Sequence, residues 1–198
     1  MAKLYFNYSA MNAGKSTNLL QASFNYRERG MNTILFTAAI DTRSPEGRIT
    51  SRIGLEAPAI PFHANTDIFE IVLKAKSSEP VDAVFLDEAQ FLSPDQVRQL
   101  ARIVDELGLP VLCYGLRTDF LGDLFPGAAT LMALADDIRE LKTICHCGRK
   151  ATMNLRIDQN GDAVIRGDSI EIGGNDRYAA LCRAHFYEEI NKVKNRDV

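Results

Sequence analysis

The sequence predicts an α/β fold: a parallel β-sheet flanked by helices, followed by a small C-terminal domain of different character. Two observations predict the sheet. A short apolar segment, residues 4–6, runs into a loop containing Gly14 and Lys15 and then into an amphipathic segment reaching Arg29. A near-continuous apolar run, residues 81–86, ends in Asp87 and Glu88, as expected of a central parallel strand. A group of cysteines and histidines after position 144 marks the second domain.

Composition limits the function classes. The chain has 198 residues, enough for one larger domain and one small one, and its 46% hydrophobic and 25% charged residues are typical of soluble globular proteins. A net charge of −3 gives no general attraction to nucleic acid or anionic membrane, and we expect neither as a partner. No apolar run reaches the ~18 residues of a membrane span, and the N-terminus shows no signal-peptide pattern. We therefore expect a cytoplasmic protein whose four cysteines are thiols or metal ligands.

The loop after the first strand is predicted to bind phosphate. Strand, loop and helix form the context of a P-loop, in which backbone N–H groups and a helix N-terminus favour an anion. Lys15 would reach the terminal phosphates, and the hydroxyl of Ser16 would bind Mg²⁺. Ser9 stands where the pattern has glycine. The predicted ATP-binding residues here are Ser9, Ala10, Met11, Asn12, Ala13, Gly14, Lys15, Ser16 and Thr17. We expect the fold class to be a P-loop NTPase, of RecA-like type.

Residues 33–76 are predicted to form a strand, a loop and a helix, and the loop could add to the phosphate site. Residues 33–37 predict a buried strand, and residues 67–76 predict a helix with apolar residues at helical spacing. Between them, residues 41–58 show no periodicity and predict a mobile loop containing Arg43. Two interpretations of this loop stay open: a solvated surface loop, or a lid whose arginines close over a triphosphate at the end of a strand.

Asp87 and Glu88 are the candidate catalytic carboxylates. A charge at the end of a core strand is costly to bury, and nucleotide-bound Mg²⁺ gives Asp87 a reason to be there. Glu88 would then lie beside the terminal phosphate, placed to accept a proton from an attacking hydroxyl.

The rest of the first domain is predicted from caps and apolar runs. Ser93, Pro94 and Gln96 form a strong helix start, and Gly108 ends that helix. Residues 111–115 predict a strand with a buried, inert Cys113, residues 116–127 a loop, and residues 131–135 a short helical segment. Phe120 and Phe125 could line a base pocket or pack under the sheet, and both interpretations stay open.

The C-terminal part predicts a zinc ribbon. A hairpin over residues 152–166 turns at Asn160-Gly161, a glycine-containing loop follows, and a helix begins near Cys182. Thiolates with one imidazole suit structural Zn²⁺, and His146 is a rival to His185 as the fourth ligand. We expect domains over residues 1–144 and 145–198, with zinc bound by Cys145, Cys147, Cys182 and His185.

Four motifs together resemble the cytosolic, zinc-containing (type II) thymidine kinases, and among them the bacterial members. The motifs are residues 11–16, residues 87–91, the cysteine and histidine set, and residues 172–178, and the likeness spans nearly the whole chain. The resemblance implies transfer of the γ-phosphoryl group of ATP to the 5′-hydroxyl of thymidine, giving dTMP in nucleotide salvage. It also implies a homotetramer inhibited by dTTP. The sequence leaves open whether deoxyuridine is a substrate.

The resemblance also assigns site residues. Glu88 matches the catalytic base, Asp87 and Ser16 the Mg²⁺ site, and Gln90 and Arg43 further positions on the ATP side. The loop that ends at Tyr178 resembles a "lasso" that wraps thymine and is anchored by the zinc ribbon. The implied thymidine-site residues are Met11, Phe91, Leu116, Phe120, Phe125, Ile172, Gly173, Gly174 and Tyr178.

Two other functions fit some of the same residues. Residues 87–90 also resemble the second motif of helicase-type motors, but such motors need two ATPase-sized domains and a basic track, and this chain is short and slightly acidic. A nucleotide-sensing zinc-ribbon module would bind ATP without turnover, and it would leave Glu88 without a structural role.

Overall fold

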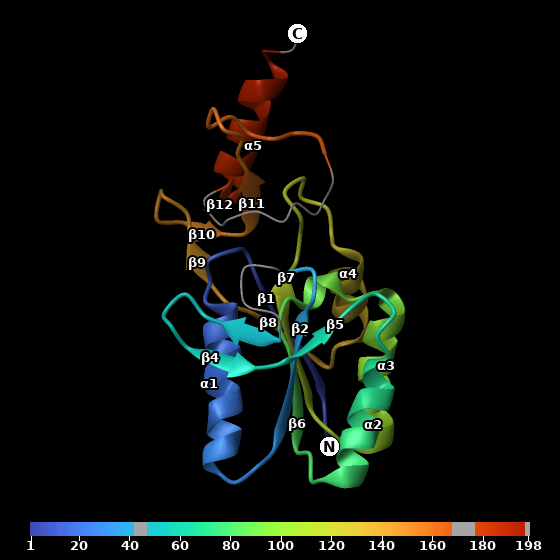
Figure 1. Cartoon of the computed structure of the whole chain (residues 1–198). Coiled ribbons are helices and arrows are strands. Elements are labelled where there is room, and N and C mark those ends of the chain that lie inside the picture. The colour runs from blue at the N-terminus through green and yellow to red at the C-terminus, as the bar shows by residue number, and fades with distance from the viewer. Residues whose placement is uncertain (42–46, 168–176, 197–198) are drawn as a thin grey trace.

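The structure is a computed structural model that describes residues 1–41, 47–167 and 177–196. Its centre is a six-stranded sheet in the order β5-β2-β6-β7-β1-β8, in which every neighbouring pair is parallel (Figure 1). This confirms the predicted α/β fold with a parallel sheet. The strands are β1 (Leu4–Ser9), β2 (Thr33–Ala38), β5 (Ile60–Phe62), β6 (Ala83–Leu86), β7 (Val111–Leu116) and β8 (Asp137–Glu140).

The two faces of the sheet bury different helices. The long helices are α1 (Lys15–Glu28), α2 (Ile68–Ser78), α3 (Pro94–Leu107) and α4 (Pro126–Leu134). Side chains alternate across a strand, so Val84 and Leu86 pack with α2, α3 and α4, whereas Ala83 and Phe85 pack with α1. Figure 1 shows the resulting layers, with α1 on one side of the sheet and α2 and α3 on the other. The continuous apolar run of β6 reflects this burial on both faces.

Helix ends follow the capping signals in the sequence. Ser93 and Gln96 form the predicted capping box at the start of α3, with the Gln96 N–H donating to Ser93 Oγ at 3.2 Å. Gly108 ends α3 in the left-handed conformation, with a φ of 69°. Gly14 precedes α1 with a φ of 76°, which explains why the phosphate loop needs glycine there.

The predicted mobile loop over residues 41–58 is wrong for residues 48–58. Strands β3 (Arg48–Thr50) and β4 (Glu56–Pro58) form an antiparallel hairpin, and β5 follows at once as an edge strand of the main sheet. Ile49 and Ala57 bury the hairpin against the α1 side of the sheet. Three-residue strands contain too few alternations to show a period of two, so the pattern was missed.

Two more sequence expectations need correction. The helical segment predicted over residues 131–135 is the end of α4, which begins at Pro126; its alanines and glycine give no polar and apolar faces from which to read its start. In the predicted hairpin over residues 152–166 only the first strand exists, as β11 (Met153–Arg156). A single bridge, Ile157 to Ala163, closes the turn, and β11 instead pairs antiparallel with β12 (Tyr178–Leu181). Pairing with a distant segment gives no local signal.

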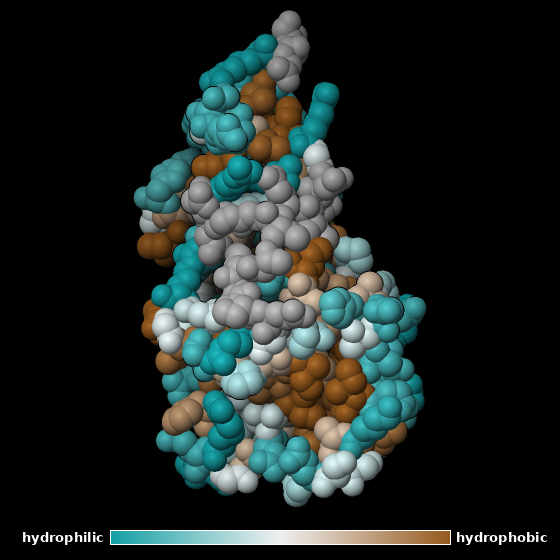
Figure 2. Space-filling view, viewed as in Figure 1, coloured by the Kyte–Doolittle hydropathy of each residue, from teal (hydrophilic) through white to brown (hydrophobic). Residues whose placement is uncertain are grey.

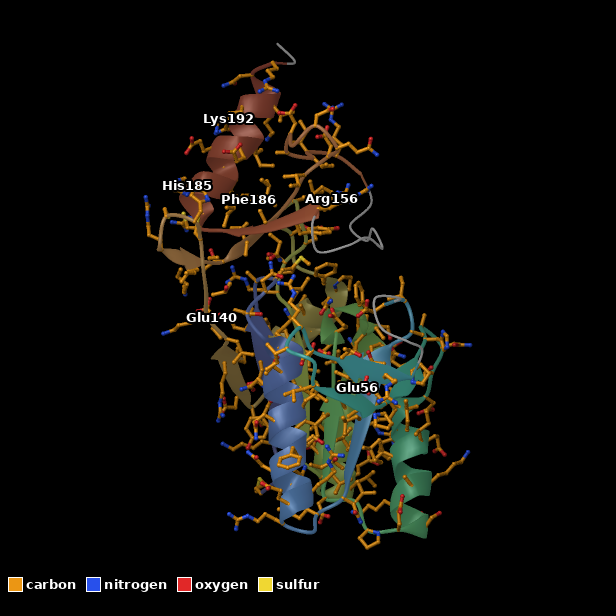
Figure 3. The ribbon with its side chains drawn as sticks, turned by 60° about the vertical axis from the view of Figure 1, so that its left-hand side comes forward. Glu56, Glu140, Arg156, His185, Phe186 and Lys192 are labelled. Carbon is orange, nitrogen blue, oxygen red and sulfur yellow. The ribbon has the colours of Figure 1, made fainter. Side chains whose placement is uncertain are left out.

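The C-terminal region has its own small core. It contains β9 (Thr143–Ile144), β10 (Lys150–Ala151), β11, β12 and α5 (Arg183–Lys194), and it extends from the end of the sheet where the parallel strands finish (Figure 1). In Figure 3, Phe186 lies on α5 and points toward the strands, while Glu140 lies where the two regions join. Lys150 Nζ contacts Glu140 Oε2 at 2.6 Å at this junction. The two regions have separate apolar clusters. The domain boundary near residue 144 stays a prediction, which these clusters support.

The surface is mixed. Figure 2 shows polar side chains over the helices at both sides of the lower region and apolar side chains gathered on the face between them. Among the helices of the described ranges, none combines the length and the apolar character that crossing a membrane requires.

Candidate active site and metal centre

A cavity of about 290 Å³ opens at the carboxyl edge of the sheet. It lies where β1, β2, β6 and β7 end, so that loops following four parallel strands meet, which is where open α/β sheets bind ligands. The hairpin of β3 and β4 contributes another wall. The lining residues are Met11, Asn12, Gly14, Lys15, Ser16, Thr17, Thr37, Asp41, Arg48, Ile49, Thr50, Ser51, Arg52, Asp87, Glu88 and Leu116.

The phosphate loop forms one side of this cavity. Lys15 begins α1, and its Nζ lies 3.3 Å from Ser9 Oγ and 3.4 Å from the Ala10 carbonyl oxygen. The Ser9 hydroxyl itself donates to the Ala10 carbonyl at 2.7 Å. Ser9, the departure from the usual glycine, is therefore compatible with the loop and holds its lysine close to the cavity. The side chain of Lys15 is 9% exposed, so its charge acts in a partly dehydrated setting.

Asp87 faces the phosphate loop from the end of β6. Burial and the nearby charge of Glu88 raise the pKa of Asp87 to about 7, against a hydrogen bond from Ser16 and the positive charge of Lys15. The two predicted Mg²⁺ ligands, Ser16 and Asp87, are thus in contact. A buried carboxylate beside a hydroxyl is an oxygen donor set that fits Mg²⁺, whose charge would offset the cost of ionising Asp87.

Glu88 has an unusual backbone conformation, and a neighbouring glutamine holds its carboxylate. Its φ is +54°, a left-handed conformation that costs a residue with a Cβ roughly 1–2 kcal/mol. The Gln90 amide donates to Glu88 Oε2 at 2.5 Å, and Gln90 Oε1 accepts from the Leu116 N–H at 2.9 Å. A Cβ at Gly115 would come within 2.8 Å of Gln90 Oε1, so the strand end needs glycine here. Strain of this kind is found mostly at functional sites.

Gln90 therefore has a contact that the sequence did not indicate. It was expected on the ATP side, but it is 2% exposed and its amide holds the Glu88 carboxylate. We assign to it the orientation of Glu88, and its place among the ATP-binding residues stays a prediction.

The structure places the expected thymidine-site residues in different settings. Met11 and Leu116 line the cavity. Phe125 is buried and packs edge-to-face against Phe91, with ring centroids 5.9 Å apart. Phe120 is 1% exposed. In the described residues both rings are therefore packed inside the protein, and their place in a base pocket stays a prediction. Tyr178 begins β12, whereas Arg43, Ile172, Gly173 and Gly174 lie outside the described residues.

Arg48 and Arg52 line the cavity from the hairpin, within the stretch 41–58 whose arginines one of the two interpretations of the loop placed over a triphosphate. One further residue was missed by sequence reasoning. Asn154 lies in β11 and accepts a hydrogen bond from the Met11 N–H at 2.7 Å. Nothing near Asn154 in the sequence marks it, because its partners are distant along the chain.

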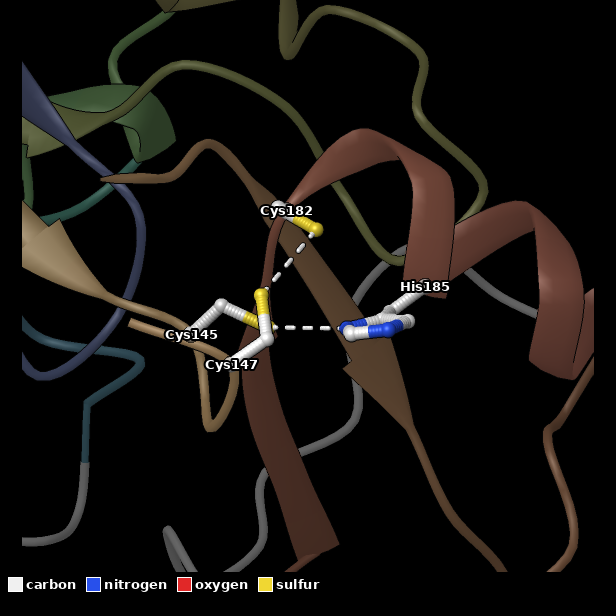
Figure 4. Close-up of side chains that lie close together, drawn as sticks. All are labelled: Cys145, Cys147, Cys182 and His185. Atoms are coloured by element: carbon white, nitrogen blue, oxygen red, sulfur yellow. Dashed lines mark hydrogen bonds between the residues drawn. The ribbon is translucent and has the colours of Figure 1, made fainter. Parts of the chain in front are cut away.

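The predicted zinc ligands converge in the C-terminal region (Figure 4). Cys145 and Cys147 lie between β9 and β10, Cys182 precedes α5, and His185 is in its first turn. Their ligand atoms all lie within 4.8 Å of one another. Of the two candidate histidines, His185 belongs to this group, while the ring of His146 stacks on that of His185 at 4.3 Å.

The distances within this group fit a tetrahedral zinc ion. The Sγ atoms of Cys147 and Cys182 are 3.9 Å apart, and Cys145 Sγ is 3.3 Å from His185 Nδ1. Zinc bonds of about 2.3 Å to sulfur and 2.0 Å to nitrogen set ligand atoms about 3.5–3.8 Å apart in a tetrahedron, and both distances are within about 0.2 Å of that range. Burial disfavours the Cys145 thiolate, but N–H groups of Cys147 and Cys182 and the His185 ring outweigh it and lower the Cys145 pKa to about 5. The cluster is thus suited to structural zinc.

Comparison with known proteins gives a family. The sequence profile described as "Thymidine kinase" matches residues 2–186. This chain belongs to the thymidine kinase family. It is 62% identical over 192 residues to the thymidine kinase of Novosphingobium aromaticivorans, a match that covers 97% of this chain and all of that protein. It is 58% identical to that of Zymomonas mobilis, covering 98% of this chain, and 57% identical to that of Vibrio cholerae, covering 97%, and each match spans the full length of the relative.

Proposed function

We propose that this protein transfers the γ-phosphoryl group of ATP to the 5′-hydroxyl of thymidine. The observation that carries the proposal is the convergence of Lys15, Ser16, Asp87 and Glu88 on one cavity at the carboxyl edge of the sheet. Family membership and the curated relatives named thymidine kinase support the substrate. The helicase-type alternative is not favoured.

Each side chain has a role in the proposed reaction. The Lys15 ammonium and the loop N–H groups bind the terminal phosphates and neutralise charge that spreads over the transferred group. Ser16 and Asp87 would hold Mg²⁺, which would neutralise the β- and γ-phosphate oxygens. Glu88 accepts the proton of the 5′-hydroxyl as that oxygen attacks phosphorus. The Gln90 amide donates to Glu88 Oε2 and so holds the carboxylate at the wall of the cavity.

Nucleoside choice should depend on polar pairing. Met11 and Leu116 give apolar contact at the cavity wall, which discriminates weakly between bases. A pyrimidine edge left without its hydrogen bonds costs much more, so cytidine should be rejected more strongly than deoxyuridine. The loop that ends at Tyr178 is proposed to supply those bonds through its backbone.

Four finer properties belong to the same proposal. We propose a structural zinc at Cys145, Cys147, Cys182 and His185, inhibition by dTTP at the site that binds thymidine and ATP phosphates, and a cytoplasmic location. We also propose a homotetramer, for which exposed apolar side chains such as Ile144, 73% exposed, and Ile60, 38% exposed, give support. Light scattering would give the mass of the assembly, and inhibition kinetics with dTTP would test the regulation.

The test of the function is a kinase assay on a nucleoside panel with wild type, Glu88→Gln and Glu79→Gln. Glu79 is exposed at the end of α2 and serves as the matched control. Thymidine should be phosphorylated by wild type and by the control. In Glu88→Gln the turnover should fall about 10²–10⁴-fold with ATP binding retained, since only the general base is lost. ATP hydrolysis without thymidine phosphorylation by wild type would overturn the proposal.

A further inference from the structure

Asn154 joins the C-terminal region to two loops of the active site. Its side chain is 2% exposed, and it comes from β11, at the base of the region that holds the zinc cluster. Asn154 Oδ1 accepts from the N–H of Met11 at 2.7 Å, and Asn154 Nδ2 donates to the carbonyl of Thr118 at 3.1 Å. One amide thus links the phosphate loop to the loop that follows β7.

The chemistry of this bridge requires an amide at this length. It needs an acceptor toward Met11 and a donor toward Thr118 at the same time, which a neutral carboxamide supplies in one plane. A leucine of similar shape would take this partner away from the N–H of the partly buried Met11 and from the carbonyl of the buried Thr118. A carboxylate could still accept from Met11 but would face the Thr118 carbonyl with no proton to donate.

Neighbouring contacts make the junction rigid. Arg117 Nη2 donates to the Thr152 carbonyl at 3.4 Å, and the Arg156 guanidinium lies 3.7 Å above the centroid of the Phe120 ring. Figure 3 shows Arg156 within the C-terminal region, beside its strands and level with Phe186. Residues 152–156 therefore contact the loop after β7 on both sides of Asn154. The amide lies at the centre of a fixed interface rather than at its edge.

We propose that Asn154 is a positioning residue that sets the phosphate loop against the loop after β7, and so sets ATP against the nucleoside. This inference rests on the proposed kinase function. Met11 lies in the phosphate loop, Leu116 ends β7 directly before the loop that holds Thr118, and both line the reaction cavity. A shift between the two loops would therefore change the distance between the γ-phosphorus and the acceptor oxygen. The zinc-binding region then contributes to catalysis through one side chain in β11.

The expected effect is a loss of turnover rather than of binding. Displacement of reacting groups by about 1 Å can cost about 10²-fold in rate. In Asn154→Leu and Asn154→Asp, kcat should fall by about that factor, while the Kd values of ATP and thymidine measured separately change little. Water should also compete better with the misplaced hydroxyl, so more ATP should be hydrolysed per thymidine phosphorylated.

A pH profile separates positioning from simple destabilisation. At low pH the carboxyl group of Asn154→Asp carries a proton, donates to Thr118 and still accepts from Met11, so its kcat relative to wild type should rise as pH falls. Asn154→Leu has no such proton and should show no rise. Hydrogen exchange at the Met11 amide should be faster in Asn154→Leu and near the wild-type rate in Asn154→Asp.

The controls decide between the outcomes. Leu155→Met changes the next residue, which packs in the C-terminal core, and should keep kcat. Unchanged kcat in both Asn154 variants overturns the proposal, as does a loss that follows lost zinc or a lowered Tm with no pH rescue in Asn154→Asp. If wild type does not phosphorylate thymidine, the kinase function fails instead, and Met11 exchange still tests the bridge by itself.

Discussion

The sheet region and the C-terminal region solve the problem of placing reactive side chains in different ways. In the sheet region, two apolar clusters cover both faces of six parallel strands, and the strand ends carry Asp87 and the phosphate loop to one edge. In its described residues, the C-terminal region has one smaller apolar cluster. Two two-stranded sheets and helix α5 surround its four candidate metal ligands.

This difference assigns the source of rigidity in each region. Large buried surface holds the sheet without a ligand, since burial of apolar area is the main favourable term in folding. A region of about 50 residues buries little apolar surface and is marginally stable by itself, and a bound structural metal would add to its stability. The loop after β7 is in contact with both regions, so its order should depend on the metal as well as on the sheet.

Removing the metal should give the largest difference in stability between the two regions. Cys182→Ala, or a chelator, should unfold the C-terminal region, because zinc binding contributes about 10 kcal/mol or more to the folding free energy of small zinc domains. Hydrogen exchange should rise in β10, β11, β12 and α5 and stay slow in β6 and β7. Cys113→Ala, the same change inside the sheet core, is the control and should keep zinc. Fast exchange in both regions would contradict the independence of the sheet.

Truncating a leucine in each core tests whether the two regions unfold independently. Leu100 in α3 is fully buried in the large cluster, and Leu100→Ala should lower the free energy of unfolding of the sheet region by about 2–5 kcal/mol. Leu155→Ala should instead weaken zinc binding and speed exchange in the C-terminal region alone. Denaturant titration followed by hydrogen exchange would report each region. An effect of Leu155→Ala on β6 exchange would show that the two cores unfold together.

Sequence reasoning succeeded where the signal was local and failed where pairing was distant. The phosphate loop, the apolar run before Asp87 and the Ser93 capping box each occupy a short stretch with a physical cause nearby. The predicted zinc ligands form two such stretches, one with Cys145 and Cys147 and one with Cys182 and His185, and thiolates with an imidazole suit the same metal. Strand β8 contains Asp137 and Arg139 at the sheet edge and so lacks the apolar run of β6. Strand β12 and Asn154 depend on partners far along the chain, and no local pattern could show them.

The burial of Asp87 gives the sheet region a pH dependence of its own. Burial and Glu88 raise the pKa of Asp87 to about 7 from an unfolded value near 4. The uncharged form is favoured in the folded state, so without metal and nucleotide the free energy of unfolding should fall as pH rises from about 4 to 7, by at most a few kcal/mol. Asp87→Asn should abolish this fall, and Asp105→Asn, on the exposed side of α3, should not. A fall of equal size in Asp87→Asn would contradict the assignment.

The smallest expected effect concerns the hydrogen bond behind the base, which tests whether the sheet region needs more than packing to place its chemistry. Gln90→Met keeps the volume but removes both the bond to Glu88 and the bond from the Leu116 N–H. We expect kcat to fall about 10-fold, equal to about 1.4 kcal/mol, because Glu88 can then rotate away from the acceptor hydroxyl. Gln99→Met removes an amide that accepts from the Ile68 N–H at the start of α2, far from the cavity, and should lower stability without lowering kcat. Steady-state kinetics with denaturant curves on both variants separates the two. Equal kcat in Gln90→Met and wild type would show that the left-handed backbone of Glu88 is sufficient to aim its carboxylate, and that side-chain hydrogen bonds orient chemistry only at the junction with the C-terminal region.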